Sequence, residues 1–362
     1  MDINSNLLYL KVKEHLLDKI KTMNPNDRIP SRNELVKEYS VTRTTVDRAI
    51  SELIGEGYLY SRDGSGTYVS EESSQENNQK ISEVVSWGII LPNIMHDTYP
   101  GILRGVEDIA NENGINAVIC NTDNNAEKQA NYIYKLIDSG IKGIVMVPAI
   151  RDEYDLAPFK ILQQKNIPFV FCNRGIPGVE APRVISNNFY GSYITTKHLI
   201  EQGYKKIAFV SRPMYSSSSE RYQGYTSALA EAGMDLDEDY VVFEDSFDFE
   251  RPGYESTKSI LGRKPVPDSI FCFNDVIAKG AYEAIVDSGL KVGQDIGLAG
   301  YDNTNICESL PVKLTSVKFK TYETGSKAAE LLLAIIKGEN VQKNKTIILQ
   351  PELVIRESSC PV

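Results

Sequence analysis

The stretch IPSRNELVKEYSVTRTTVDRAI, residues 29–50, decides the fold of the N-terminal part of the chain. Ser31 followed by Glu34 has the spacing of a capping box, which predicts a helix that starts there and ends near Tyr39. Only Ser40 and Val41 separate that helix from Thr42, which can cap the next one. Two helices joined by so short a turn predict a helix-turn-helix.

The flanking residues complete this small domain. Upstream, residues 7–23 place apolar side chains at three- and four-residue steps, which predicts one further helix. Downstream, residues 58–69 alternate around the glycine-rich turn Gly64-Ser65-Gly66, which is typical of a β-hairpin. We therefore expect residues 1–70 to form an α+β winged helix-turn-helix that binds DNA.

A polar segment follows this domain. Residues 70–80 contain no large apolar side chain, so residues 71–82 are expected to form a flexible linker. Beyond it, short apolar runs alternate with helical segments, which is the βαβ pattern of doubly wound parallel sheets. Residues 83–362 are therefore predicted to form an α/β domain with parallel sheets.

Ligands in such sheets bind at the carboxyl ends of the strands, so the residues directly after each apolar run are the candidates. Those positions hold carboxylates, amides and arginines, which suit bonding to vicinal hydroxyls, and an aromatic ring at Tyr99, Phe273 or Phe319 could stack on a sugar. The candidate ligand-binding residues are Asp97, Tyr99, Asn173, Arg174, Arg221, Asn274 and Asp302.

Composition and charge exclude several classes of protein. The net charge is −10, and residues 1–70 hold ten Lys/Arg and ten Asp/Glu, so the remainder carries 29 minus 39. The N-terminal domain is therefore neutral overall and must gather its positive charge on one face. The sequence has no apolar run long enough for a membrane span and no signal peptide, which predicts a cytoplasmic protein without a membrane partner. The sequence shows no metal-ligand spacing, serine–histidine pattern or dinucleotide motif, so we expect no enzyme, metal or cofactor.

The segments IPSRNEL, VTRTTVDRAI, LIGEGYLY and GSGTYV resemble the GntR family over residues 7–70. In that family the start of the third helix enters the major groove and the wing tip approaches the minor groove. The expected DNA-binding residues are Arg32, Asn33, Arg43, Thr44, Thr45, Asp47, Arg48, Gly64, Ser65 and Gly66. Asp47 departs from the family, which often has a basic residue there. Its carboxylate either accepts a hydrogen bond from cytosine or forms an ion pair with Arg43 or Arg48.

The region from about Trp87 to Arg356 resembles the LacI/GalR regulators and the type I periplasmic sugar-binding proteins. The segments that carry the resemblance are PGILRGVEDIA, GIKGIVMVP, ERYQGYTSALAEAG, FNDVIAKGAYEAI, GLAGYDN, LTSVK and PELVIRES. The resemblance implies a two-lobed, periplasmic-binding-protein-like domain with Arg221, Asn274 and Asp302 as its main ligand positions. Asp275 is expected to cap the helix that follows it.

The two resemblances together are typical of the arabinose-repressor group. They imply a homodimeric repressor of carbohydrate-utilisation genes that binds double-stranded operator DNA at the nucleoid and is released by a small sugar, with L-arabinose as the leading candidate. Two lobes, residues 84–185 plus 317–345 and residues 186–316 plus the final strand, would close around the sugar and shift the dimer. An activator or a co-repressor-dependent regulator remains an alternative, as does a sugar-transport binding protein, which would need a signal peptide.

Overall fold

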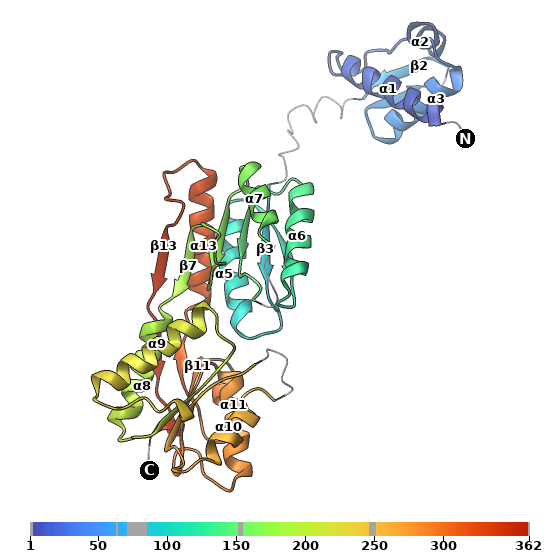
Figure 1. Cartoon of the computed structure of the whole chain (residues 1–362). Coiled ribbons are helices and arrows are strands. Elements are labelled where there is room, and N and C mark those ends of the chain that lie inside the picture. The colour runs from blue at the N-terminus through green and yellow to red at the C-terminus, as the bar shows by residue number, and fades with distance from the viewer. Residues whose placement is uncertain (1–2, 63, 71–84, 151–154, 246–250, 361–362) are drawn as a thin grey trace. The chain divides into compact units, whose positions relative to one another are not determined.

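The computed structural model describes residues 3–62, 64–70, 85–150, 155–245 and 251–360 (Figure 1). The chain divides into two compact units, Met1–Val84 and Val85–Val362. The linker predicted at residues 71–82 lies outside the described residues.

The first unit is a winged helix-turn-helix, as predicted. Its elements are α1 (Ile3–Ile20), α2 (Arg32–Tyr39), α3 (Arg43–Gly55), β1 (Leu59–Arg62) and β2 (Gly66–Val69). The capping box at the start of α2 is confirmed, because Ser31 accepts from the Glu34 amide while the Glu34 carboxylate accepts from the Ser31 amide at 2.7 Å. Thr42 caps α3 through the amide of Thr45. These caps satisfy amides that the first turn of a helix leaves without partners.

One apolar core holds the three helices and the hairpin together. Leu16, Leu35 and Leu53, one from each helix, are fully buried. The antiparallel hairpin closes this core because Leu59 pairs with Val69 and both are buried.

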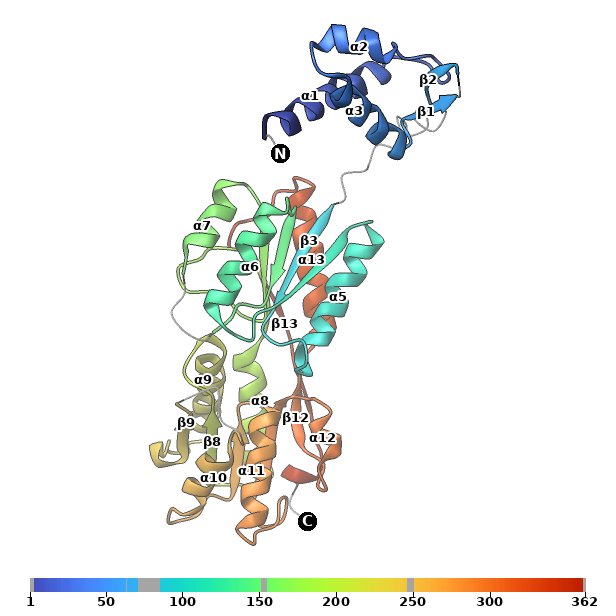
Figure 2. The same cartoon turned by 90° about the vertical axis from the view of Figure 1, so that its right-hand side faces the viewer.

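The second unit contains two six-stranded sheets, which define an N-lobe and a C-lobe (Figure 2). The N-lobe sheet is parallel throughout, with strand order β13 (Thr346–Leu349), β7 (Arg183–Ser186), β6 (Phe169–Cys172), β5 (Gly143–Met146), β3 (Ser86–Leu91) and β4 (Asn116–Asn121). The C-lobe sheet has the order β14 (Glu352–Val354), β12 (Thr315–Lys318), β11 (Gly297–Asp302), β10 (Ser269–Cys272), β8 (Ile207–Ser211) and β9 (Val241–Phe243). Only the edge strand β14 is antiparallel in that sheet.

Helices cover these sheets and bury their apolar runs. In the N-lobe they are α5 (Thr98–Glu112), α6 (Ala126–Asp138), α7 (Ala157–Gln164) and α13 (Thr321–Ile336). In the C-lobe they are α8 (Asn188–Glu201), α9 (Ser216–Glu231), α10 (Tyr254–Leu261), α11 (Asp275–Asp287) and the short α12 (Ile306–Ser309). The N-lobe has one core beneath α5 and α13 and another beneath α6 and α7, so both faces of its sheet are buried.

Small residues set the distance between α5 and α13. A Cβ added at Gly105 would lie 2.2 Å from the Tyr322 carbonyl oxygen and 2.7 Å from the Ser326 amide nitrogen. The backbones therefore approach more closely than any side chain at residue 105 would allow.

Three crossovers join the lobes, after β7, β12 and β13. The predicted division differs from the structure in two places. β12 continues the C-lobe sheet to Lys318, so the chain enters the N-lobe only afterwards. β13, which lies beyond the predicted end of the N-lobe at residue 345, pairs with β7 in the N-lobe sheet. Asn187 links two of these crossovers. Its side chain caps α8 through the Tyr190 amide at 3.0 Å and donates to Gln350 Oε1 at 3.2 Å.

Candidate DNA-binding face and ligand pocket

A polar hollow of about 240 Å³ lies between the starts of α2 and α3 and the wing. Arg28, Arg32 and Arg43 line it, together with Asn33 and Gly66. Four predicted DNA-binding residues, Arg32, Asn33, Arg43 and Gly66, thus meet in one place. A hollow rich in guanidinium groups beside the starts of two helices is suited to a phosphate.

Asp47 ties two of these arginines together. Its Oδ1 accepts from Arg32 Nε at 2.7 Å, and its Oδ2 lies 3.8 Å from Arg43 Nε. The ion pair with Arg43 is one of the two alternatives from the sequence, and the contact with Arg32 was not anticipated. Arg48 instead pairs with Glu52 at 3.7 Å and places its guanidinium 3.8 Å from the Tyr9 ring centroid on α1.

The wing tip has the backbone that its glycines permit. Gly64 and Gly66 have φ values of +68° and +130°, which side chains rarely tolerate. Ser65 Oγ lies 2.5 Å from the Tyr68 hydroxyl. At the start of α3, the Thr45 hydroxyl bonds to that of Thr42 at 2.8 Å, while Thr44 is exposed.

In the second unit, a pocket of about 210 Å³ lies where strands of both lobes reach their carboxyl ends. Six of the seven predicted ligand residues line it: Tyr99, Asn173, Arg174, Arg221, Asn274 and Asp302. Asp97 does not line it, although His96 and Thr98 do. Asp97 already has helical backbone angles at the start of α5, where successive side chains point about 100° apart.

The C-lobe wall of this pocket is centred on the buried Arg221 of α9. Its Nε donates to Asn188 Oδ1 at 3.1 Å, and its Nη2 lies 3.5 Å from Asp302 Oδ1. The guanidinium stacks on Tyr301 at 3.4 Å and on Phe273 at 4.2 Å. Burial raises the pKa of Asp302, and Arg221 opposes that shift.

The expected role of Asp275 is wrong. Asn274 is the residue that caps α11, through the Ile277 amide at 3.0 Å. Asp275 instead accepts from Ser316 Oγ at 2.6 Å and from both the amide and the hydroxyl of Thr304, at 2.7 and 3.0 Å. Burial, followed by the nearby Asp302, raises the pKa of Asp275 to about 7.

The N-lobe wall is formed by the residues that follow β6. Asn173 takes a φ of +64°, and Arg174 is buried with its Nε donating to the Pro148 carbonyl at 2.7 Å. Of the three aromatic candidates, Tyr99 and Phe273 line the pocket. Phe319 does not, because it packs into the N-lobe core.

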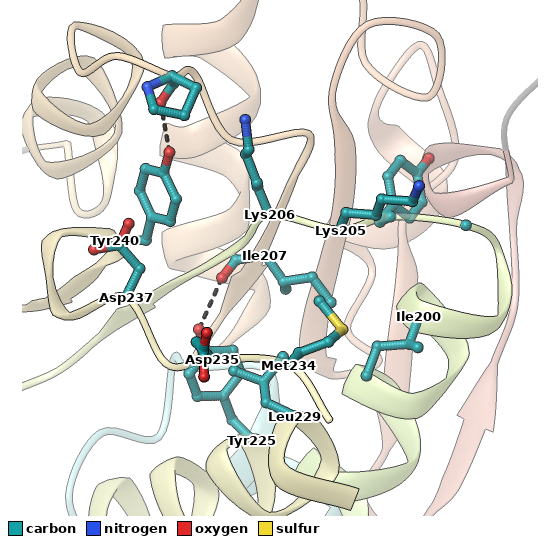
Figure 3. A pocket seen from close by; sticks show the side chains of 13 residues that line it. Ile200, Lys205, Lys206, Ile207, Tyr225, Leu229, Met234, Asp235, Asp237 and Tyr240 are labelled. Carbon is teal, nitrogen blue, oxygen red and sulfur yellow. Dashed lines mark hydrogen bonds between the residues drawn. The ribbon is translucent and has the colours of Figure 1, made fainter. Parts of the chain in front are cut away.

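A larger cavity, of about 580 Å³, lies in the C-lobe near the amino end of β8 (Figure 3). Two of its three tyrosine hydroxyls are already used: Tyr225 donates to the Ile207 carbonyl at 2.8 Å and Tyr240 to the Pro265 carbonyl at 2.5 Å. Since ligands of parallel sheets bind at the carboxyl ends of the strands, the smaller pocket remains the candidate ligand site.

Within the described residues, no His, Cys, Asp and Glu side chains group together as a metal site would require. No described helix is both long and apolar enough to cross a membrane.

Comparison with known proteins agrees with both units. Residues 8–69 match the model of bacterial regulatory proteins of the gntR family, and residues 196–359 match that of the periplasmic binding protein-like domain. The HTH-type transcriptional repressor PurR of Actinobacillus pleuropneumoniae serotype 3 is 31% identical over 288 residues, which cover 79% of this chain and 84% of that protein. The chain therefore belongs to the same family of bacterial transcriptional repressors as this PurR protein.

Two further relatives match almost the whole of the repressor. The arabinose metabolism transcriptional repressor of Halalkalibacterium halodurans is 27% identical, with 99% of this chain and 97% of that protein covered. The solved transcriptional regulator CelR–cellobiose complex is 26% identical with a TM-score of 0.68, and covers 91% of this chain and 100% of that chain. The predicted combination of a GntR-type DNA-binding domain with a LacI/GalR-like domain is confirmed, and the repressor is a DNA-binding protein.

Sequence reasoning missed several residues of both sites. Arg212 directly follows β8 and lines the pocket. The rule that ligands meet the carboxyl ends of strands should therefore have selected Arg212. Asn124 and Tyr215 lie a few residues beyond their strands, in loops whose path the sequence does not reveal. In the first unit, Arg28 lines the hollow but was not among the predicted DNA-binding residues.

Proposed function

We propose that this sugar-responsive repressor controls genes for carbohydrate use and leaves its operator when a small sugar binds, with L-arabinose as the first compound to test. The observation that carries the proposal is the pocket at the carboxyl ends of the strands. It combines Arg221, Asp302 and Asn274 with the rings of Tyr99 and Phe273. Guanidinium, carboxylate and amide groups beside aromatic rings are the usual means of holding a polyol.

Operator DNA binds, in this proposal, at the face formed by the starts of α2 and α3 and by the wing. Arg32, Asn33 and Arg43 contact the backbone or a guanine, and Thr44 and Thr45 contact phosphates or thymine methyl groups. Gly64, Ser65 and Gly66 approach the minor groove. Arg48, held by Tyr9 and Glu52, reaches only the edge of this face.

The active form is a homodimer that works in the cytoplasm, at the nucleoid when DNA is bound, and without catalysis. The edge strand β4 supports a contact between copies, because Val118 and Ile119 are 41% and 50% exposed there. Exposed apolar side chains on an edge strand are usually covered by another element or another copy.

Release follows from movement of the lobes about the three crossovers. A sugar held by Tyr99 and Asn173 on the N-lobe side and by Arg221 and Asp302 on the C-lobe side stabilises the closed arrangement. Closure alters the dimer contact and hence the spacing of the two DNA-binding domains, so one of them loses its half-site.

Thermal unfolding of the full-length repressor against pentoses, hexoses and their derivatives tests this function. One compound should raise the unfolding temperature by several degrees, and Arg221→Ala or Asp302→Ala should abolish that rise. A rise that survives both substitutions would place the effector elsewhere.

A further inference from the structure

The charges around the ligand pocket are unbalanced. Three arginines line it, Arg174, Arg212 and Arg221, whereas Asp302 is the one carboxylate among the described lining residues. Arg221 is paired with Asp302 at 3.5 Å, and Arg212 lies 3.4 Å from Glu244, which is buried behind the pocket wall. These two pairs leave the charge of Arg174 to be accounted for.

Arg174 is 6% exposed, and its described partners are neutral. Its Nε donates to the Pro148 carbonyl oxygen at 2.7 Å and its Nη2 to Asn124 Oδ1 at 3.2 Å, while the Tyr215 ring lies 5.8 Å from the guanidinium. Among the residues that the structure describes, none places a carboxylate within ion-pair distance of it. A guanidinium has five N–H donors, so three remain for a ligand.

A buried positive charge is strongly unfavourable unless an anion or several good acceptors compensate it. The neighbouring residue cannot compensate it, since Asn173 also lines the pocket but carries a neutral amide. Asp302 already faces Arg221, with its Oδ1 3.5 Å from Arg221 Nη2. Within the described ranges, therefore, the pocket holds no counter-charge for Arg174, and a ligand that enters it can supply one.

We infer that the effector is an anionic sugar derivative whose carboxylate or phosphate group binds Arg174. The inference rests on the proposed function, which places the effector in this pocket, and it narrows the ligand from sugars in general to acidic ones. The hydroxyl groups bind Arg221, Asp302 and Asn274 on the C-lobe side, and the anionic group faces the N-lobe wall. Aldonic or uronic acids and sugar phosphates share this chemistry.

Calorimetric titration of the full-length repressor with matched sets tests the inference. One set is D-glucose, D-gluconate, D-glucuronate and D-glucose 6-phosphate; the other is D-ribose, D-ribonate and D-ribose 5-phosphate, with L-arabinose and inorganic phosphate titrated separately. An acidic or phosphorylated member should bind at least about tenfold more tightly than its neutral parent, since hydrogen bonds to charged groups are the stronger ones. Binding by the acids alone, or by the phosphates alone, identifies the anionic group.

The variant Arg174→Gln should weaken binding of the anionic compound by about tenfold to a hundredfold and change the affinity for its neutral parent little. It should also raise the unfolding temperature of the ligand-free protein, because an uncompensated buried charge is removed. Arg183→Gln is the matched control, since Arg183 is an exposed N-lobe arginine whose Nε donates to Thr346 Oγ1 at 3.0 Å. It should leave every affinity unchanged.

Two outcomes overturn the inference and differ in what they mean for the proposed function. If L-arabinose or another neutral sugar binds as tightly as the acids and phosphates, and Arg174→Gln weakens all of them equally, the pocket holds a neutral sugar and only the inference fails. If no compound binds at millimolar concentration, the inference and the proposed sugar response fail together.

Discussion

Replacing Asp47 by alanine separates the two possible roles of this unusual acidic residue. In the structure its carboxylate holds Arg32 at 2.7 Å and lies 3.8 Å from Arg43, and all three side chains are well exposed, by 44%, 37% and 68%. Exposed ion pairs contribute only ~0.2–1 kcal/mol to stability. The variant should therefore unfold within about 1 kcal/mol of the wild type.

Operator binding should change more than stability. Each arginine carries ~2 kcal/mol of side-chain conformational entropy, part of which is already lost when Asp47 fixes the guanidinium. Without that restraint we expect a loss of about 1–2 kcal/mol per DNA-binding domain, which is about five- to thirtyfold per half-site and about thirty- to 900-fold for a dimer on its full operator. Binding to unrelated DNA should instead strengthen, because a negative charge beside the phosphates is removed.

Fluorescence anisotropy with a duplex selected by the wild-type repressor, and with a scrambled duplex, measures both effects at several salt concentrations. Glu56→Ala is the matched control, because Glu56 forms an ion pair with Lys13 and is 46% exposed, outside the hollow. The reasoning is refuted if Asp47→Ala strengthens binding to both duplexes by the same factor. A loss confined to one cytosine of the operator would show instead that Asp47 contacts that base directly.

Three further predictions concern the second unit. Gly105→Ala should lower the free energy of unfolding of this unit by ~1–3 kcal/mol in urea, because the new Cβ would lie 2.2 Å from the backbone of α13. The control Gly262→Ala, whose Cβ would lie 3.4 Å or more from its neighbours, should leave the free energy of unfolding nearly unchanged. The folded-state pKa of Asp275, about 7, lies above its ordinary value, so the Asp275 carboxyl holds its proton more tightly in the folded protein than in the unfolded chain. The protein should therefore lose stability as pH rises from about 4 through 7. Asp275→Asn should flatten the dependence of unfolding temperature on pH over that range. An unchanged slope would show that other groups cause the pH dependence. Ile119→Glu on β4 should yield monomers in sedimentation velocity. The control Ile348→Glu, on the opposite edge strand β13 and 52% exposed, should leave the dimer intact. Dimers of both variants would exclude the β4 contact.

Much of the fold could be predicted because local signals agree with the overall arrangement. The Ser31–Glu34 capping box and the Thr42 cap are read from spacing alone, and the structure has both. Alternating strands and helices are equally local, so the parallel sheets could be predicted from the apolar runs, whereas the division into two lobes came from the resemblance to the LacI/GalR regulators. The boundary near residue 317 was wrong because β12 is placed by its pairing with β11, which is remote in sequence.

The pocket could be predicted only to the level of strand ends. The rule that ligands meet the carboxyl ends of strands found six of the seven proposed residues. It failed at Asp97, because the direction of a side chain depends on where the helix starts. The cap of α11 was assigned to Asp275, whereas Asn274 both lines the pocket and caps the helix, since either residue of the pair can cap it. The choice depends on Thr304 and Ser316, which approach Asp275 from other elements.

The most direct test of the central claim is the affinity of the full-length repressor for its operator duplex, measured with and without the compound that raises its unfolding temperature. Coupling of ~1–3 kcal/mol between the two sites predicts that the compound weakens operator binding by about five- to 150-fold, and that Arg221→Ala abolishes the effect while still binding DNA. An operator affinity that the bound compound leaves unchanged would contradict the account.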